Sequence, residues 1–425
     1  MGKINIAGAK TLEGKVRIGG AKNASLPILA ATLLAESKNT IKEVPPLKDV
    51  LTICEVLKQL GCSVEFGENG EIDVDSSELT EVEASDELVR QMRASFLVIG
   101  PLLARMKKAR IPLPGGCAIG SRPIDLHLKG FAALGADIKF NHGFVEATCD
   151  DLIGDRVYLD FPSVGATENL MMAATRAKGE TVIENAAEEP EVVDLANFLN
   201  KLGAKVVGAG TDTIKIEGVK ELSGTEHTVI PDRIEAGTFM AAAAISRGDV
   251  LIENVISEHV KPVMRKMEEM GVSVTESDGN VRIKSKGRQL KPVKLKTLPY
   301  PGYPTDMQPQ MVSLLSTVPG ESIVTETVFE NRFRHVEELK RMNANIIVQG
   351  NSAIINGASS LLGAPIKATD LRAGASLVLA GLVAEGTTQV HDMYHLERGY
   401  YGFMDKLSKL GAEIWKDHEN IKKVL

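Results

Sequence analysis

A short apolar phrase centred on a glycine recurs along the whole chain. In its first copy, Gln59-Leu60-Gly61-Cys62-Ser63-Val64, a large apolar residue precedes the glycine and an apolar position follows it. The pattern returns at intervals of about 70 residues, which is typical of repeat architectures. The central residues of the copies are Gly61, Gly135, Gly203, Gly271, Asn343 and Gly411.

Each copy predicts the end of a helix and the start of a strand. Glycine, and less often asparagine, adopts the left-handed backbone conformation that closes many helices. Apolar and polar positions then alternate through 63–66 and, beyond a polar turn, through 71–74. Upstream of the fourth copy, 236–246 and 260–270 have helical patterns and 250–253 a strand pattern. Each repeat therefore predicts a β-α-β-α-β-β unit.

Six such units exceed one hydrophobic core, and 425 residues point to two domains. We expect an α/β protein with three repeats in each domain and a boundary near 229–233. One domain is predicted at 22–230, and the other combines 1–21 with 231–425.

The second repeat is the longest, and its additional residues fall in the loop 112–123. This loop contains Gly115, Gly116, Cys117 and Gly120, so it predicts an irregular backbone with an accessible thiol. An apolar stripe at Ile124, Leu128, Phe131 and Leu134 predicts a helix directly after it. From the loop alone, a functional cysteine and an incidental one on a surface loop are equally good interpretations.

Cations stand at equivalent helix starts in three repeats, at Lys22, Arg93 and Arg372. A positive charge is unfavourable at the positive end of a helix unless an anion lies nearby. The alternative is ordinary solvated surface charge. Three equivalent positions favour a shared site for phosphate or carboxylate groups.

The composition narrows the function classes further. Charged residues make up 25% of the chain, and the net charge of −7 argues against a nucleic-acid partner or membrane surface. The four cysteines include no C-x-x-C pair and form no disulfide framework, so no metal site is expected. We expect a cytoplasmic protein, because there is no signal-peptide pattern and no apolar run that could insert into a membrane.

Together, the Cys117 loop, the sixfold repeat and Gly19-Gly20-Ala21-Lys22-Asn23-Ala24 resemble the enolpyruvyl transferase family over essentially the whole chain. The resemblance implies a two-domain inside-out α/β barrel with the active site in an interdomain cleft. It also implies transfer of the enolpyruvyl group of phosphoenolpyruvate to a hydroxyl group, with release of phosphate and without a cofactor.

The segment 115–127 is similar to the branch of the family whose acceptor is UDP-N-acetylglucosamine, which begins peptidoglycan synthesis. The shikimate-pathway branch is the alternative within the enzyme class. A non-catalytic repeat scaffold is the alternative outside it.

The resemblance also assigns catalytic roles. It makes Cys117 the proton donor, Asp306 the base near the sugar hydroxyl, and Asp370 a second acidic group near the reacting carbon. Helix capping is the alternative for Asp306, and capping or pairing with Arg372 for Asp370. The residues that the resemblance places around phosphoenolpyruvate are Lys22, Asn23, Arg122 and Arg398, with Arg93 near both substrates.

Nucleotide recognition is implied at two segments. The first consists of Arg122, Pro123, Ile124, Asp125 and Leu126, and the second, whose backbone would meet the diphosphate, of Ser163, Val164 and Gly165. His127 is equally compatible with packing and with binding. Val328 and Phe329 match residues that line the sugar pocket, although both could be ordinary core. Phe161 departs from the family, in which many relatives carry a basic residue before this second segment, so a nucleotide contact is in doubt.

Overall fold

The computed structural model describes residues 2–113, 124–357 and 360–416, apart from the side chains of Arg90 and Gln91. Within them, contacts divide the chain into two compact units. The first unit contains residues 19–113 and 124–232, and the second contains 2–18 and 233–416. Each unit has its own hydrophobic core, and the two sets of core residues do not overlap.

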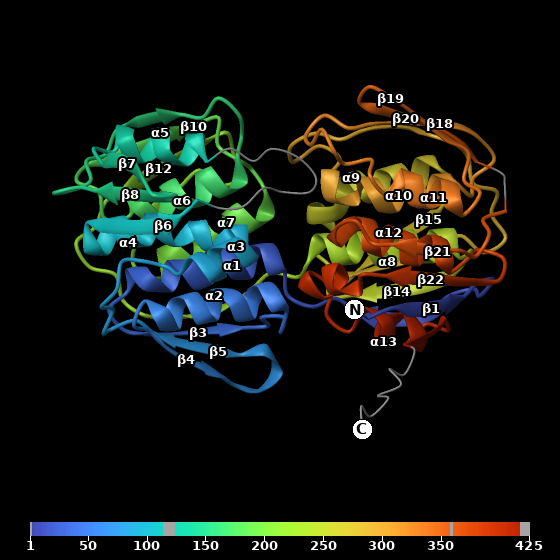
Figure 1. Cartoon of the computed structure of the whole chain (residues 1–425), viewed down its shortest axis with the longest axis horizontal. Helices are drawn as coiled ribbons and strands as arrows, with labels where there is room; N and C mark the ends of the chain where they lie inside the picture. The colour runs from blue at the N-terminus through green and yellow to red at the C-terminus, as the bar shows by residue number, and fades with distance from the viewer. Residues whose placement is uncertain (1, 114–123, 358–359, 417–425) are drawn as a thin grey trace. The chain divides into compact units, whose positions relative to one another are not determined.

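The first unit holds three repeats in chain order (Figure 1). The first repeat consists of α1 (Lys22–Ala31), η1 (Thr32–Leu34), β3 (Lys38–Lys42), α2 (Lys48–Gln59), β4 (Ser63–Phe66), η2 (Glu68–Gly70) and β5 (Ile72–Asp75). The second consists of α3 (Asp86–Gln91), η3 (Arg93–Val98), α4 (Ile99–Met106), β6 (Lys108–Pro112), α5 (Asp125–Ala133), β7 (Asp137–Asn141) and β8 (Phe144–Thr148). The third consists of β9 (Arg156–Tyr158), α6 (Val164–Ala174), β10 (Glu180–Glu184), α7 (Pro190–Lys201), β11 (Lys205–Val207), β12 (Thr213–Glu217) and the trailing β13 (Glu226–Thr228).

The second unit repeats this arrangement after two N-terminal strands, β1 (Ile4–Ala7) and β2 (Glu13–Arg17). The fourth repeat consists of α8 (Arg233–Ile245), β14 (Asp249–Glu253), α9 (Ser257–Glu269), β15 (Ser273–Ser277) and β16 (Asn280–Lys284). The fifth consists of β17 (Lys294–Lys296), η4 (Thr305–Met307), α10 (Gln308–Leu315), β18 (Gly320–Thr325), α11 (Val336–Arg341), β19 (Ile346–Gln349) and β20 (Ser352–Gly357). The sixth consists of β21 (Pro365–Lys367), α12 (Leu371–Gly381), β22 (Thr387–His391), η5 (Met393–Arg398), α13 (Phe403–Lys409) and β23 (Glu413–Lys416).

The predicted helix ends are present in all the repeats. Gly61, Gly135, Gly203, Gly271, Asn343 and Gly411 all have positive φ, between 70° and 107°. Each follows a helix and precedes a strand, as in α2 and β4 around Gly61. The left-handed conformation predicted for the repeated phrase is therefore confirmed.

Every repeat builds one sheet, and the described sheets share a pattern. In the third repeat β9 runs parallel to β10, which pairs antiparallel with β12, and β12 pairs antiparallel with β11. The second repeat has only the three-stranded sheet β6-β8-β7, and an isolated parallel bridge between Glu83 and Arg110 occupies the position of its fourth strand.

Three strands each complete the sheet of a repeat that lies far from them in the chain. β13 completes the sheet of the first repeat by pairing parallel with β3. β2 pairs parallel with β14 in the fourth repeat, and β1 lies between β22 and β23 in the sixth. Distant parts of the sequence thus complete the sheets of each unit.

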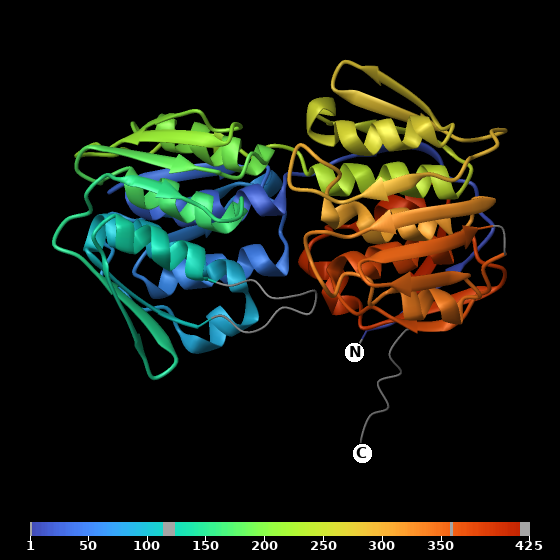
Figure 2. The same cartoon turned by 90° about the horizontal axis from the view of Figure 1, so that it is seen from above.

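The first helix of each repeat in the second unit lies in the interior of that unit, and the sheets lie outside. The chain of α10 is buried along its whole length, as is nearly all of α8. A helix that is apolar or small on all faces must be enclosed by other elements. Figures 1 and 2 show α8, α10 and α12 in the middle of the second unit with strands around them. The outer strands alternate instead, as in the intermediate-buried-exposed pattern of β16, so one face of each sheet meets solvent.

Candidate active site

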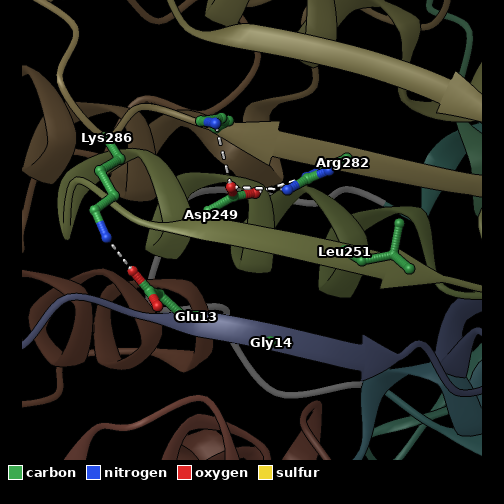
Figure 3. Close-up of a pocket in the computed structure, with 7 residues that line it drawn as sticks. Glu13, Gly14, Asp249, Leu251, Arg282 and Lys286 are labelled. Carbon is green, nitrogen blue, oxygen red and sulfur yellow. Dashed lines mark hydrogen bonds and ion pairs between the residues drawn. The ribbon is translucent and has the colours of Figure 1, made fainter.

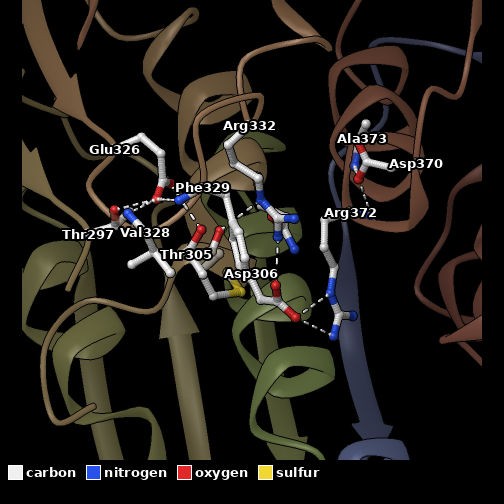
Figure 4. A network of polar contacts seen from close by, with 12 residues as sticks. Thr297, Thr305, Asp306, Glu326, Val328, Phe329, Arg332, Asp370, Arg372 and Ala373 are labelled. Carbon is white, nitrogen blue, oxygen red and sulfur yellow. Dashed lines mark hydrogen bonds and ion pairs between the residues drawn. The ribbon is translucent and has the colours of Figure 1, made fainter. Parts of the chain in front are cut away.

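Asp306 lies between two arginines in the second unit (Figure 4). Arg332 Nη2 donates to Asp306 Oδ1 at 2.6 Å, while Arg372 Nε and Nη2 donate to Oδ2 at 3.0 and 2.9 Å. Asp306 lies inside η4, and the residues that cap η4 and α10 are Pro304 and Met307. The helix-cap alternative for Asp306 is therefore wrong.

Both arginines that contact Asp306 are buried. Arg332 is 2% exposed and Arg372 is 3% exposed, so both guanidinium groups need an anion close by. Arg332 Nε also donates to the backbone oxygen of Thr305 at 3.2 Å. The carboxylate is thus held from both sides by donors of fixed geometry. For Arg372, the anion that the helix-start argument required is the side chain of Asp306.

Asp370 is the N-cap of α12. Its Oδ1 accepts hydrogen bonds from the backbone amides of Arg372 and Ala373, both at 3.0 Å. Capping was one of the two alternatives to the role near the reacting carbon, and it places the carboxylate beside the helix start that carries Arg372. Asp370 also acts electrostatically on His335 and His395.

The pKa values of these two histidines reflect the burial of their rings. Burial lowers the pKa of His335 to about 4, although Asp370 opposes the shift. The Nδ1 atom of His335 lies 3.1 Å from the backbone oxygen of Arg332. Burial also lowers the pKa of His395, and the charge of Arg398 lowers it further. Arg398 ends η5, which packs against α12, and its charge and that of Asp370 both act on His395.

Val328 and Phe329 follow β18 in the same network. Their backbone amides donate to Glu326 Oε1 at 2.8 and 3.1 Å. Glu326 Oε2 accepts a hydrogen bond from the hydroxyl of Thr305, the neighbour of Asp306, at 3.0 Å. The structure therefore connects Val328, Phe329 and Asp306 through a single carboxylate.

In the first unit, Lys22 pairs with Asp49. The Lys22 Nζ atom lies 3.1 Å from Asp49 Oδ2, and the two side chains are 12% and 5% exposed. Lys22 and Asn23 open α1, while Asp49 lies in the first turn of α2. This lysine at a helix start therefore has a carboxylate of the protein close by, and the shared anion site expected from the helix starts stays a prediction.

A second group of predicted residues meets around His127. Burial lowers the pKa of His127 to about 3, and the charge of Arg93 lowers it further. The ring meets Phe96 edge-on with centroids 5.3 Å apart, and its Nδ1 atom lies 3.1 Å from Asn169 Nδ2. The side chain is 8% exposed, which favours packing over binding as the role of its ring.

Gly165 touches this histidine. A Cβ atom at Gly165 would lie 3.3 Å from His127 Cε1. Ser163 caps α6 by accepting a hydrogen bond from the amide of Ala166 at 3.4 Å, and Val164 is the first residue of that helix. The structure thus brings the segment 163–165 beside α5, whose first turn carries Asp125 and Leu126.

Some predicted site residues cannot be placed. Cys117, Arg122 and Pro123 lie outside the described residues. Ile124 is described as the residue before α5, half-buried against the core of the first unit. The apolar stripe that follows is confirmed, because Leu128, Phe131 and Leu134 are buried.

Three residues with clear contacts to the predicted site were missed. Arg332, Glu326 and Asp49 each bond directly to a predicted residue or to its neighbour. Asp49 stands in the first turn of a predicted helix, where an acidic residue is common for reasons of dipole alone. Nothing in the local pattern of Arg332 and Glu326 marked them as buried.

Figure 3 shows a surface hollow elsewhere, on the sheet of the fourth repeat. It measures about 600 Å³, and Glu13, Gly14, Asp249, Leu251, Arg282, Lys284 and Lys286 line it. Its cations have carboxylate partners: Arg282 and Lys284 face Asp249, and Lys286 faces Glu13. None of the predicted site residues lines this hollow, and its charges are already paired.

Comparison with known proteins identifies the family. The family model described as EPSP synthase (3-phosphoshikimate 1-carboxyvinyltransferase) matches residues 6–407. The chain belongs to the enolpyruvyl transferase family. Among solved structures, the enolpyruvyl transferase NikO from Streptomyces tendae superposes with a TM-score of 0.89 at 25% identity, over 98% of this chain and 99% of that one. An EPSP synthase from Acinetobacter baumannii, 21% identical, shares the fold with a TM-score of 0.78. The predicted family and fold class are confirmed.

Curated enolpyruvyl transferases include more similar relatives. UDP-N-acetylglucosamine 1-carboxyvinyltransferase 2 of Carboxydothermus hydrogenoformans is 61% identical over 97% of this chain and 99% of its own length. UDP-N-acetylglucosamine 1-carboxyvinyltransferase 1 of Caldanaerobacter subterraneus subsp. tengcongensis is 58% identical over 97% and 99%.

Two further observations concern the described part of this enolpyruvyl transferase. It contains no group of three or more His, Cys, Asp or Glu residues arranged to hold a metal ion. Within the same residues, every helix is too short or too polar to span a bilayer.

Proposed function

We propose that this enolpyruvyl transferase moves the enolpyruvyl group of phosphoenolpyruvate to the 3′-hydroxyl of UDP-N-acetylglucosamine and releases phosphate. The observation that carries this proposal is the identity of 56–61% over nearly the whole chain to enzymes named for that reaction. The sequence predicted the same activity. We also propose that the reaction serves peptidoglycan synthesis in the cytoplasm.

The proposed reaction proceeds by addition and then elimination. The sugar 3′-oxygen forms a bond to C2 of phosphoenolpyruvate as it loses its proton, and C3 gains a proton. In the second step C3 loses a proton, the C2–O bond to phosphate breaks, and the enol ether remains. The chemistry therefore needs a base, an acid and cations around the phosphate and carboxylate groups.

In this proposal Asp306 accepts the hydrogen bond of the sugar hydroxyl. Its clamp between Arg332 and Arg372 supports that role, because it fixes the direction of the carboxylate before the acceptor binds. Asp370 would lie near the reacting carbon, and Cys117 would supply the proton to C3. A thiol with its ordinary pKa is mostly protonated at neutral pH, which suits a donor.

Lys22, Arg122 and Arg398 would hold phosphoenolpyruvate, with Asn23 and Arg93 near it. The nucleotide would meet Pro123, Ile124, Asp125 and Leu126 and the backbone of Ser163, Val164 and Gly165, while Val328 would line the sugar site. The close approach of Gly165 to His127 supports a segment without side-chain bulk there. The proposal requires residues of both units to act on the same substrates.

Phosphate release from phosphoenolpyruvate tests the proposed acceptor. We expect release with UDP-N-acetylglucosamine and none above background with shikimate 3-phosphate. The reverse result would assign the chain to the shikimate branch, and binding of both substrates without turnover would support a scaffold. Alkylation of Cys117 should abolish the release, whereas full turnover after complete alkylation would remove Cys117 from the mechanism.

A further inference from the structure

Glu326 holds together the backbone segments on which the proposed acceptor residues lie. Its side chain is buried, with the residue 4% exposed, directly after β18. Its Oε1 atom accepts hydrogen bonds from Thr297 Oγ1 at 2.9 Å and from the amides of Val328 and Phe329 at 2.8 and 3.1 Å. Its Oε2 atom accepts one from Thr305 Oγ1 at 3.0 Å (Figure 4).

These four donors come from three segments that lie outside the strands, at the ends of β17 and β18 and at the start of η4. Thr297 follows β17, Thr305 opens η4, and Val328 and Phe329 form the turn after β18. Thr305 and the turn 328–329 lie outside the strands, so the ladder of the sheet does not fix their positions. The amide of Thr297 does donate to Thr325 O at 2.9 Å, and the carboxylate of Glu326 adds the side-chain bonds that tie Thr305 and the turn 328–329 to this backbone.

Neighbouring bonds fix the carboxylate itself. The amide of Glu326 donates to Asn351 O at 2.8 Å. The amide of Thr327 donates to Thr297 Oγ1 at 3.0 Å, and the hydroxyl of Thr327 donates to Thr297 O at 2.6 Å. Hydrogen bonds of its own backbone and of the next residue, Thr327, thus hold Glu326 in place.

We propose that Glu326 is a positioning residue that sets the sugar-binding turn 328–329 and the carboxylate of Asp306 at a fixed relative position. It acts on Asp306 through Thr305, whose backbone oxygen is held by Arg332 at the same time. This inference rests on the proposed function, since it assigns Val328 to the sugar and Asp306 to the 3′-hydroxyl. Glu326 itself needs no contact with either substrate.

If Glu326 has this positioning role, its loss should impair the use of UDP-N-acetylglucosamine more than that of UDP or phosphoenolpyruvate. Loss of the four bonds should weaken UDP-N-acetylglucosamine and slow its reaction, because both the sugar wall and Asp306 shift. Binding of UDP should change little, because the residues proposed for the nucleotide lie in the first unit. The KM for phosphoenolpyruvate should also stay close to that of the unaltered enzyme. A residue that only stabilises the fold would lower the melting temperature without this separation.

Glu326→Ala and Glu326→Gln form the first test. Glutamine keeps an acceptor oxygen for the three donors at Oε1, and its amide group can bond to the Thr305 hydroxyl. We expect Glu326→Ala to raise the KM for UDP-N-acetylglucosamine and lower kcat, each roughly tenfold or more, and Glu326→Gln to restore most of both. Equal losses in the two variants would mean that charge rather than geometry matters, and would overturn the proposal.

Glu321→Gln is the matched control, because Glu321 lies exposed on the same strand, β18. It should leave every kinetic constant within about twofold, as surface substitutions usually do. The unaltered protein is assayed beside the variants with UDP-N-acetylglucosamine. If the unaltered protein shows no turnover, the proposed function fails. If it turns over and the variants lack the predicted separation, only the role of Glu326 fails.

Thr305→Val gives a second test that does not depend on the folding of Glu326→Ala. It removes one bond to Oε2 and should lower kcat roughly tenfold with the phosphoenolpyruvate KM unchanged. If Glu326 reaches Asp306 through Thr305, the double variant Glu326→Ala/Thr305→Val should lose no more kcat than Glu326→Ala alone. Unchanged kcat in Thr305→Val, or additive losses in the double variant, would contradict the proposed path.

Discussion

The residues of the candidate site are fixed mainly by buried charge pairs. Asp306 is held by Arg332 and Arg372, and Lys22 is held by Asp49. Removing one partner of such a pair leaves an uncompensated charge in a poorly solvated place, so single substitutions have large effects. The sequence offered one member of each pair through the family resemblance. The partner came from a distant segment, and no local pattern indicates which distant side chain a buried charge will meet.

Asp306→Asn should slow the reaction strongly. The amide keeps the shape of the side chain but loses the charge that Arg332 and Arg372 face and the capacity to accept the proton of the sugar hydroxyl. We expect kcat to fall roughly a hundredfold or more, with a smaller change in the KM for phosphoenolpyruvate. Steady-state phosphate release measures this, and a melting curve shows whether the variant is folded. A folded variant with kcat within threefold of the unaltered enzyme would remove Asp306 as the base.

Asp49→Asn should destabilise the first unit. It leaves the largely buried ammonium group of Lys22 without its carboxylate, which typically costs about 3 kcal/mol in the free energy of unfolding. Urea unfolding measures this change. Glu55→Gln is the control on the same helix, because the pair of Glu55 and Lys58 is exposed and should contribute about 0.5 kcal/mol. Equal effects of the two substitutions would show that the Lys22–Asp49 pair is effectively solvated.

Glu168→Gln should change how stability depends on pH. Burial raises the pKa of Glu168 well above its usual value of about 4.5, and Glu191 and Glu189 raise it further. The folded state therefore holds a proton that the unfolded state releases. The stability from this group is complete below pH 4.5 and is lost as the pH rises towards the pKa in the folded state.

Glu168→Gln does not lose stability in this way as the pH rises, because glutamine does not titrate. From about pH 5 upwards, the free energy of unfolding of Glu168→Gln relative to the unaltered protein should increase by up to about 1.4 kcal/mol per pH unit. Urea unfolding at a series of pH values measures the difference. Parallel curves for the two proteins between pH 5 and 8 would mean that Glu168 does not hold its proton in the folded state.

At the scale of the elements, the sequence predicted the repeated unit well. The glycine or asparagine at the end of each repeat fixes a helix end, and the alternation after it fixes a hairpin. Both signals are local, so the sequence contains them directly. The exchange of β1, β2 and β13 was not predicted, because pairing between distant strands depends on which sheet edges remain open once the unit has folded. β13 is also short, with three residues and little alternation to detect.

Strand exchange predicts that the two units differ as separate fragments. Residues 19–232 contain every strand of the described sheets of the first unit, whereas 233–425 lacks β1 and β2. The second fragment would lose buried residues such as Ile4, Ile6 and Val16 and would leave three strands, β14, β22 and β23, each without one neighbour. We expect 19–232 to melt cooperatively alone.

The fragment 233–425 should melt cooperatively only when a peptide of residues 1–18 is added. Circular dichroism during heating measures both cases. A scrambled peptide of the same composition is the control. An identical cooperative transition of 233–425 with and without the peptide would show that β1 and β2 are dispensable.

On the scale of the whole molecule, two separate cores carry the residues proposed for one reaction. The number of repeats leads one to expect more than one core, since six units cannot share one interior. The composition added that the molecule carries a net charge of −7, so anionic substrates depend on local clusters of cations. Neither repeat count nor composition indicates which side chains form those clusters.

Removal of metal ions should leave turnover unchanged. The proposed steps use a carboxylate, a thiol and cationic side chains, and no step requires a metal. Dialysis against EDTA followed by the phosphate-release assay in metal-free buffer measures this, with a parallel sample to which Mg²⁺ is returned. Loss of activity that Mg²⁺ restores would contradict the proposed chemistry.

The exchanged strands also affect how the protein is made. Ile4 pairs with Val390 and Glu13 with Asp249, so β1 and β2 leave the ribosome long before their partners are translated. The first unit, in contrast, can close its last sheet once Thr228 has emerged. During most of its synthesis the nascent chain therefore carries Ile4, Ile6 and Val16 without the sheets that will bury them, and a chaperone for extended peptides could bind these strands.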